Sequence, residues 1–370
     1  MIDPDVLLDE ESTLDPARDM GLPSHPDLAN KLTVIVPTFN RSNFIKRLLY
    51  YSNAVAFPFR TIIADSSVPG HAEQNKSSIE FQLGHLNIEW KHYDCGLLDK
   101  LSKAVSEVDS PYCCFWADDD FQLPSGLFSC LCHLEHNPDC ASCMGQFVSM
   151  RHAEPEGEFY LETYPSRDEE SAVERVMQWS KNFYTNFYAV YRTPVLREML
   201  QVAVNASCYE RCRIIPEVLM GQMSLLMGRQ KMLPTPSIVY QMHPGNDSRI
   251  TPCVRDHTSF PGDYQRYLKS MVPVVIRQTG LSDPNAERLV DRSFRNVYRW
   301  TGGSFWWLKK AIENLRRPWH RMQLRFDALR KKPRFTRVIK ERIPPSDPRI
   351  GSAELATALQ IVAAHPQGMV

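Results

Sequence analysis

Three consecutive aspartates, Asp118, Asp119 and Asp120, follow directly after an apolar segment of the chain. Adjacent carboxylates repel one another, and a cation placed between them relieves that repulsion. Mg2+ and Mn2+ prefer carboxylate oxygens and substrate phosphates as ligands. The triplet therefore predicts a site for a divalent cation and a phosphorylated substrate. The alternative interpretation is a solvated acidic loop or an acidic cluster at the start of a helix.

A second carboxylate stands at a similar place. Asp65 closes the apolar segment Thr61–Ala64 and precedes Ser66 and Ser67. A carboxylate there can accept a hydrogen bond from a nucleotide base or from a ribose hydroxyl. The alternative is an ordinary Asx-turn, in which the side chain bonds the nearby backbone.

Short apolar segments alternate with segments of helical spacing around these carboxylates. The predicted strands are 32–36, 61–64, 88–90 and 112–116, and the predicted helices begin at Ser42 and cover 72–84 and 97–108. Repeated strands and helices of these lengths predict an α/β fold with a doubly wound, mostly parallel sheet, whose first strand ends at Pro37. In such a sheet, ligands bind beyond the carboxyl ends of the strands. We therefore expect 37–41, 65–67 and 117–120 to meet.

The rest of the chain divides by composition. Residues 1–30 carry eight acidic residues against one basic residue and are predicted as an irregular acidic leader. Residues 31–255 are predicted as one domain with a mixed second half. That half has strands at 145–150, 187–191 and 237–241 and helices near 169–180, 194–204 and 216–227. Residues 256–370 are predicted as a helical region, in which 292–342 carries sixteen Lys and Arg against three acidic residues.

Three segments in order resemble the opening of the family 2 GT-A glycosyltransferases. They are VIVPTFNR at 34–41, IADSS at 63–67 and SPYCCFWADDD at 110–120. The resemblance covers roughly residues 32–250. It implies a GT-A-type fold with a Rossmann-like nucleotide-binding half and a mixed acceptor half. It also implies that the nucleotide is held by Thr38, Asn40, Arg41 and Asp65.

The same resemblance puts the Asp triplet at the DxD position, which binds metal and diphosphate in this family. Ala117 stands where the longer family pattern has its first Asp. Which two of Asp118, Asp119 and Asp120 contact the metal therefore stays open.

Four more candidates follow from the resemblance. Lys100 lies where many members have an Ala-Arg-Asn segment and is the candidate phosphate-side cation; the alternative is a solvated helix face. Glu217 is the acid at a helix start that would serve as general base, although Val218 replaces the Asp of the family pattern. Its alternative is a Glu that faces the helix dipole. The loop 240–249 would close over the diphosphate, with His243 as a third metal ligand or a structural histidine, and Arg249 as a phosphate clamp.

The function implied is metal-dependent, inverting transfer of a sugar from a nucleotide-sugar donor to an acceptor hydroxyl. Mn2+ or Mg2+ is the expected cofactor, a UDP-sugar the favoured donor, and a glycan or lipid-linked molecule the expected acceptor. A nucleotidyltransferase acting on a sugar phosphate usually has a Gly-rich loop after its first strand, which 37–40 lacks. The other alternative is a non-enzymatic protein that binds membrane or nucleic acid through its basic C-terminal region. No nucleic-acid motif accompanies that region, so we expect no nucleic-acid partner.

The composition favours a cytoplasmic protein. The N-terminus has no basic n-region, and no segment reaches the ~18 apolar residues that span a bilayer. The basic and aromatic segment 292–342 suits peripheral contact with the inner face of a membrane. Alternatively, its aromatic residues pack on the catalytic domain. The ten cysteines include an adjacent pair, which suits reduced thiols better than a disulfide framework.

Overall fold

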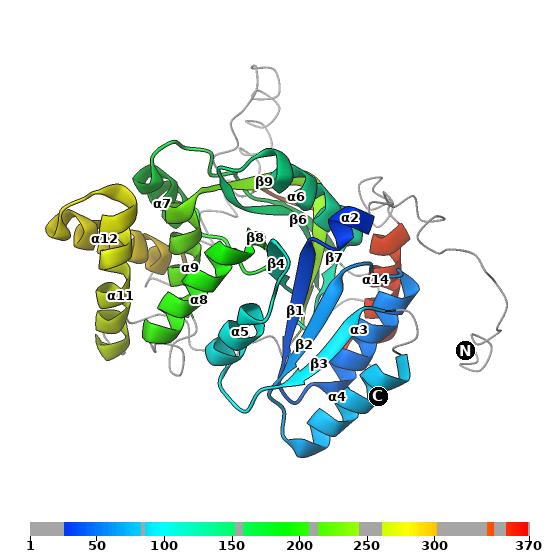
Figure 1. Cartoon of the computed structure of the whole chain (residues 1–370). Coiled ribbons are helices and arrows are strands. Elements are labelled where there is room, and N and C mark those ends of the chain that lie inside the picture. Colours follow the sequence, from blue (N-terminus) through cyan, green and yellow to red (C-terminus); the bar gives the residue numbers. More distant parts are fainter. Residues whose placement is uncertain are drawn as a thin grey trace, which may run out of the picture.

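A computed structural model of the 370-residue chain describes residues 26–82, 86–151, 158–206, 214–243, 261–301, 339–343 and 353–368. A ten-stranded sheet runs through the molecule, with helices on both of its faces (Figure 1). The order along the main path of the sheet is β10-β7-β6-β8-β4-β1-β2-β3, and β9 pairs with β5 and β6.

The first half of the sheet is parallel, as the alternation of strands and helices predicted. Its strands are β1 (Leu32–Thr38), β2 (Arg60–Asp65), β3 (Ile88–His92) and β4 (Tyr112–Phe115). The helices that connect them are α3 (Ser42–Ala54), α4 (Pro69–Gln82) and α5 (Leu97–Ser106). Because all four strands point the same way, their carboxyl ends lie at one edge of the sheet.

The prediction that Pro37 ends the first strand is wrong. β1 continues to Thr38, with Pro37 opposite Ala64 and Thr38 opposite Asp65 of β2. Pairing with β4 stops at Ile35. Pro37 cannot donate a backbone hydrogen bond, and it is tolerated here because the strand has only one neighbour at this point.

The second half of the sheet is mixed. Its elements are β5 (Phe121–Gln122), α6 (Pro124–His136), β6 (Cys140–Arg151), β7 (Glu158–Thr163), α7 (Ala172–Lys181), β8 (Val190–Arg192), α8 (Thr193–Ala206), α9 (Ile214–Met227) and β9 (Arg229–Met242). Most of its pairs are antiparallel, and β6 and β9 are parallel. The predicted strand at 187–191 is shorter than expected, because Ala189 N donates to Asn186 O in a turn before β8 begins.

Two hydrophobic clusters cover the two faces of the sheet. Alternate residues of β1 enter different clusters, since successive side chains of a strand point to opposite faces. Ile35 packs toward α5, α7, α8, α9, α11 and α12, whereas Val34 and Val36 pack toward α3, α6 and α14. The seven cysteines within the described ranges are free, which agrees with reduced thiols there.

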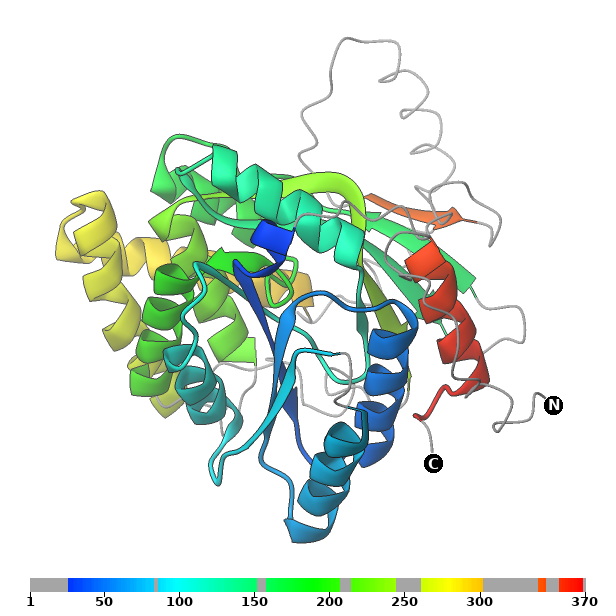
Figure 2. The same ribbon diagram turned by 45° about the vertical axis from the view of Figure 1, so that its right-hand side comes forward.

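The described parts of the C-terminal region are mainly helical, as predicted, and include one strand that was not predicted. They contain α11 (Pro261–Thr279), α12 (Asp283–Thr301) and α14 (Ala353–Ala364), and β10 (Ile339–Ile343) adds an antiparallel strand to β7. β10 fits the edge of the sheet because every residue of β7 from Phe159 to Thr163 has a partner in it. Helices α11 and α12 cover one end of the domain, and α14 lies beside α3 (Figures 1 and 2).

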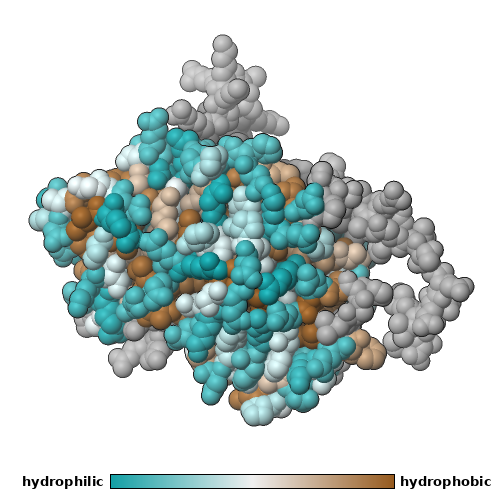
Figure 3. Space-filling view, viewed as in Figure 1, coloured by the Kyte–Doolittle hydropathy of each residue, from teal (hydrophilic) through white to brown (hydrophobic). Residues whose placement is uncertain are grey.

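Several predictions fall outside the described residues. They include the leader up to residue 25, residues 302–338 of the predicted helical region and, with them, most of the basic segment 292–342. Residues 26–29 of the predicted irregular leader form the short helix α2 (Pro26–Ala29). Among the helices of the described ranges, none is long and apolar enough to cross a membrane. On the face shown in Figure 3, hydrophilic residues cover most of the surface.

Candidate functional site

The Asp triplet occupies a turn between β4 and β5, at the carboxyl edge of the parallel strands. Asp120 N donates to Ala117 O, and the indole Nε1 of Trp116 donates to Asp120 O at 2.8 Å. The three aspartates are only 3%, 6% and 1% exposed. This burial excludes a solvated acidic loop. Buried carboxylates need cations or hydrogen-bond donors as partners.

Arg41 supplies a cation to two of the three carboxylates. Its Nη1 lies 2.5 Å from Asp118 Oδ1, and its Nη2 lies 2.9 Å from Asp119 Oδ2. Thr38 Oγ1 donates a further hydrogen bond of 2.8 Å to Asp118 Oδ2. The two carboxylates raise the pKa of Arg41 although burial opposes this, so the guanidinium stays charged. The ends of β1 and β4 are thus joined by a compact charged cluster.

His243, just past the end of β9, completes this cluster on the other side. Its Nε2 lies 2.9 Å from Asp119 Oδ2, and its ring stacks on Phe44 at a centroid distance of 5.3 Å. Burial alone would raise the pKa of Asp119, but the contacts with His243 and Arg41 outweigh it and lower this pKa. A carboxylate oxygen and an imidazole nitrogen therefore converge beside a guanidinium.

Asp120 faces away from this cluster. Its Oδ2 accepts from the Tyr188 hydroxyl, and its Oδ1 accepts from Gln241 N at 2.9 Å. Burial and the neighbouring Asp119 raise its pKa well above the ordinary value. The predicted set of four ligands is therefore not assembled. In the described ranges, no three His, Cys, Asp or Glu side chains gather into a metal-binding group.

Asp119 and His243 nevertheless fit a divalent cation by the chemistry of their donor atoms. Carboxylate oxygen and neutral imidazole are ordinary ligands of Mn2+, and substrate phosphates and water complete such a shell. The cation would be held by these two residues, with Arg41 as the charged neighbour.

Asp65 and Asn40 lie beside one another at the carboxyl ends of β2 and β1. Asp65 Oδ1 accepts from Ser67 N at 2.7 Å, and its Oδ2 accepts from Asn75 Nδ2 at 2.8 Å and Trp90 Nε1 at 3.1 Å. Burial would raise its pKa, but these donors lower it, so it stays ionised. The contact with Ser67 N is the Asx-turn named above as the alternative.

Asn40 has a left-handed backbone with φ of 55°, a conformation that Asn tolerates better than most residues. Its N donates to Ser67 Oγ at 2.7 Å, and its Oδ1 accepts from Val68 N at 3.0 Å. The loop after β1 is thus tied to the loop after β2.

Lys100 lies beneath these two loops and is 2% exposed, so the solvated helix face is excluded. Its Nζ donates to Thr38 O at 2.7 Å and to Ser66 Oγ at 2.8 Å. Burial lowers its pKa to about 8, although Asp65 and Asp118 oppose this. The ammonium group thus connects the loop after β1 with the loop after β2. The sequence predicted a phosphate contact for Lys100 and did not predict this connection.

Glu217 lies in the first turn of α9. Burial raises its pKa, and a hydrogen bond with Thr185 opposes that shift. Thr185 belongs to the same loop as Tyr188, whose hydroxyl contacts Asp120. The loop 182–189 thus lies between the candidate base and the Asp triplet. Arg249, the predicted phosphate clamp, lies outside the described residues.

Three buried residues of the site, Arg47, Tyr188 and Gln241, were not among the candidates. Arg47 Nη2 donates to Asp119 O at 2.7 Å, and its Nη1 donates to Gln241 Oε1 at 2.7 Å. The sequence did carry a signal for Arg47, because it is the one Arg of α3 and stands next to the apolar residues Leu48 and Leu49. Tyr188 and Gln241 gave none, because their partners lie 68 and 121 residues away in sequence.

Comparison with known families decides the class of this domain. Residues 33–200 match the model of glycosyl transferase family 2. This segment is a family 2 glycosyltransferase domain. The match covers the parallel strands, the Asp triplet and the first elements of the mixed half. None of the curated proteins matches the chain.

Solved structures agree with a GT-A-type fold for this glycosyltransferase. The chain resembles S. aureus TarS 1-349 with a TM-score of 0.50 and 14% identity, over 73% of this chain and 72% of that one. The same fragment in complex with UDP-GlcNAc gives a TM-score of 0.50 and 15% identity, over 73% of each chain. At these identities the likeness concerns the fold alone.

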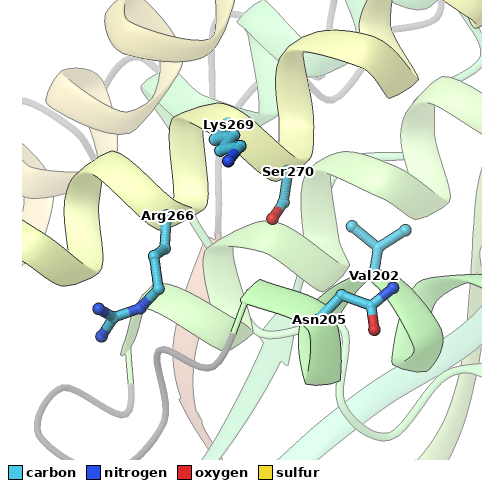
Figure 4. A pocket seen from close by; sticks show the side chains of 5 residues that line it. All are labelled: Val202, Asn205, Arg266, Lys269 and Ser270. Atoms are coloured by element: carbon cyan, nitrogen blue, oxygen red, sulfur yellow. The ribbon is translucent and has the colours of Figure 1, made fainter.

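A surface pocket between α8 and α11 shares no residue with the site. Val202 and Asn205 line it from α8, and Arg266, Lys269 and Ser270 line it from α11 (Figure 4). Arg266 is paired with Asp263 and donates to Ala206 O. Its lining residues include no carboxylate and no histidine, so it does not compete with the carboxyl edge of the sheet as a reaction centre.

Proposed function

We propose that this glycosyltransferase uses a UDP-sugar and a divalent cation, and that it inverts the configuration of the anomeric carbon. The observation that carries the proposal is the buried cluster of Arg41, Asp118, Asp119 and His243 at the strand ends of a family 2 domain. The TarS fragment of similar fold was solved with UDP-GlcNAc, which supports a uridine nucleotide as the first donor to test.

Each part of the site has a defined task in this proposal. A divalent cation held by Asp119 and His243 would supply positive charge at the leaving diphosphate. Arg41 adds a second positive charge, since its guanidinium lies against both carboxylates and its side chain is 29% exposed. Asp65 and Asn40 position the base and ribose at the ends of β1 and β2.

Glu217 is the proposed general base. The acceptor oxygen attacks the anomeric carbon, and its proton passes to the Glu217 carboxylate as the new C–O bond forms. The bond from the anomeric carbon to the diphosphate breaks, and the nucleoside diphosphate leaves with the electron pair. A Glu whose pKa is raised by burial suits this step, because a base works best when its pKa lies close to the working pH.

A peripheral contact with a membrane is proposed for the basic segment 292–342, with a lipid-linked molecule as the acceptor. Sixteen Lys and Arg against three acidic residues support it, because anionic lipids attract such a segment.

The test is a panel of UDP-, GDP-, CMP- and dTDP-sugars with and without Mn2+, read out by thermal stabilisation and by release of nucleotide. A ligand at 100 times its dissociation constant stabilises a protein by roughly 2.7 kcal/mol. We expect stabilisation and nucleotide release with UDP-sugars when Mn2+ is present. Equal stabilisation by all donors, or no effect of Mn2+, would contradict the proposal. Formation of a sugar nucleotide from a sugar phosphate would show the alternative reaction.

A further inference from the structure

The C-terminal residues 353–368, called here the C-terminal clasp, are fastened to the reaction centre through one buried arginine. Arg47 of α3 is fully buried, and its Nη1 donates to His365 O of the clasp at 2.9 Å as well as to Gln241 Oε1. Its Nη2 donates to Asp119 O. One guanidinium thus joins the clasp, β9 and the turn 117–120 that carries the Asp triplet, called here the Asp turn.

Gln241 forms a second connection between the same parts. Its Nε2 donates to Pro366 O of the clasp at 2.7 Å, and its backbone N donates to Asp120 Oδ1. The next residue but one is His243, which contacts Asp119. Two backbone carbonyls of the clasp are therefore each connected to the Asp turn through one residue: His365 O through Arg47 to the backbone carbonyl of Asp119, and Pro366 O through Gln241 to the carboxylate of Asp120.

The rest of the clasp is anchored on the same helix. Helix α14 buries Leu355, Ala358, Ile361 and Val362 against α3 and its surroundings (Figure 2). At its other end, Gly368 adopts φ of 86°, and a Cβ there would lie 2.6 Å from Asn43 C. The clasp therefore fits the start of α3 only as long as residue 368 has no side chain.

We infer that Arg47 is a positioning residue, and that the C-terminal clasp sets the geometry of Asp119 and His243 through it. The inference rests on the proposed function, in which these two residues hold the divalent cation. A guanidinium can serve three acceptors in fixed directions, whereas an ammonium at position 47 cannot hold all three. Loss of this connection lets the Asp turn shift while the fold of the sheet is kept.

Two matched pairs of variants test the inference. Gly368→Ala pushes the clasp away from Asn43, and Gly280→Ala imposes a similar backbone strain, at φ of 69°, where nothing lies within 4 Å. Arg47→Lys removes the three-way contact. Arg192→Lys is its control, because Arg192 also donates to backbone carbonyls, those of Leu134, Asn137 and Cys140, near the amino end of β4.

Two measurements are made on the full chain: hydrogen–deuterium exchange of peptides covering 117–122 and 239–243, and kcat and KM with the donor. For Gly368→Ala and Arg47→Lys we expect faster exchange in both peptides and a kcat lower by about 10-fold or more, since misplacement by ~1 Å can cost ~100-fold in rate. The controls should match the wild type in both readouts. Exchange does not depend on the reaction, so it tests the coupling even if no donor is turned over.

Unchanged exchange in Gly368→Ala and Arg47→Lys, relative to their controls, would overturn the inference. Faster exchange with an unchanged kcat would support the connection between the clasp and the Asp turn, but it would overturn the positioning role of Arg47. If Arg47→Lys does not fold, Gly368→Ala decides, because its change lies at the periphery.

Discussion

At the scale of single residues, the site buries three adjacent carboxylates by giving each its own set of partners. Asp118 and Asp119 share the cation of Arg41, whereas Asp120 relies on the hydroxyl of Tyr188 and an amide of β9. Adjacent acids with different surroundings acquire different proton affinities. Burial raises the pKa of Asp120, and His243 together with Arg41 lowers that of Asp119. Within one triplet, Asp119 can therefore carry the negative charge that faces Arg41 and His243, whereas Asp120 holds the turn to Tyr188 and β9.

Replacement of Glu217 by Gln tests the proposed base. The change keeps the size of the side chain and removes its basicity, so donor binding should stay near the wild-type value. Loss of a positioned base typically lowers the rate by about 10²–10⁴-fold. Steady-state kinetics of transfer and calorimetry with the donor check both parts. Glu198→Gln, on the surface of α8, is the control. Transfer at nearly the normal rate in Glu217→Gln would place the base elsewhere.

Lys100 should give the site a dependence on alkaline pH. Burial lowers its pKa from 10.5 to about 8, so the native protein loses this proton before the unfolded chain does. Between these values the unfolded state binds more protons, and the contribution of Lys100 to the free energy of unfolding rises with pH. Donor affinity should fall over the same range, because the positive charge near Asp65 and Asp118 is lost.

The comparison for Lys100 is Lys100→Met, measured by donor titration and by denaturant unfolding at several pH values. We expect weaker donor binding in this variant at neutral pH and a flatter dependence above pH 8. Parallel pH profiles of Lys100→Met and the wild type would contradict the assignment.

At the scale of elements, the carboxyl ends of β1, β2 and β4 bring three separate loops together. The turn after β4 then divides the triplet, since Trp116 holds Asp120 O and β9 takes the carboxylate of Asp120. Only the first two aspartates lie beside Arg41. The turn that carries the Asp triplet is therefore anchored to the rest of the domain by Asp120, the last residue of the triplet.

This division predicts different results for neighbouring substitutions. Asp119→Asn should weaken binding of Mn2+ and nucleotide, because it removes charge at the proposed ligand. Asp120→Asn should leave that affinity closer to the wild type and lower the midpoint of thermal unfolding, because one of its two buried contacts loses its acceptor. Binding and thermal unfolding of both variants check this. A loss of Mn2+ binding in Asp120→Asn as large as in Asp119→Asn would contradict the assignment.

The strand ends were predictable because β-branched runs and polar breaks are local in sequence. Thr38, Arg41, Asp118, Asp119 and His243 were all proposed from the sequence, and the fold brings them into contact. The orientation of Asp120 was not predictable, since it depends on residues 68 and 121 positions away. Strand β10 was missed, and the place of helix α14 was not predicted, for a related reason: β10 depends on an open sheet edge and the place of α14 on the surface of α3.

At the scale of the whole molecule, charge is distributed unevenly along a chain of zero net charge. Residues 1–30 carry eight acidic residues against one basic residue, whereas 292–342 carry sixteen basic residues against three acidic ones. If the basic segment docks on anionic lipid, liposome binding should rise with the fraction of acidic lipid and fall with salt, which shortens the Debye length. Co-sedimentation with vesicles checks this. Binding that ignores salt, or none, would favour the alternative in which the aromatic residues pack on the domain.

The central claim concerns the pair of Asp119 and His243, and calorimetric titration of UDP tests it most directly. Wild type, Asp119→Asn and the surface control Asp139→Asn are each titrated with Mn2+ present and again with EDTA. We predict that UDP binds the wild type and Asp139→Asn in the presence of Mn2+. Affinity should fall by about tenfold or more, which corresponds to roughly 1.4 kcal/mol per tenfold, with EDTA or in Asp119→Asn. Equal UDP affinity under all these conditions would contradict the account.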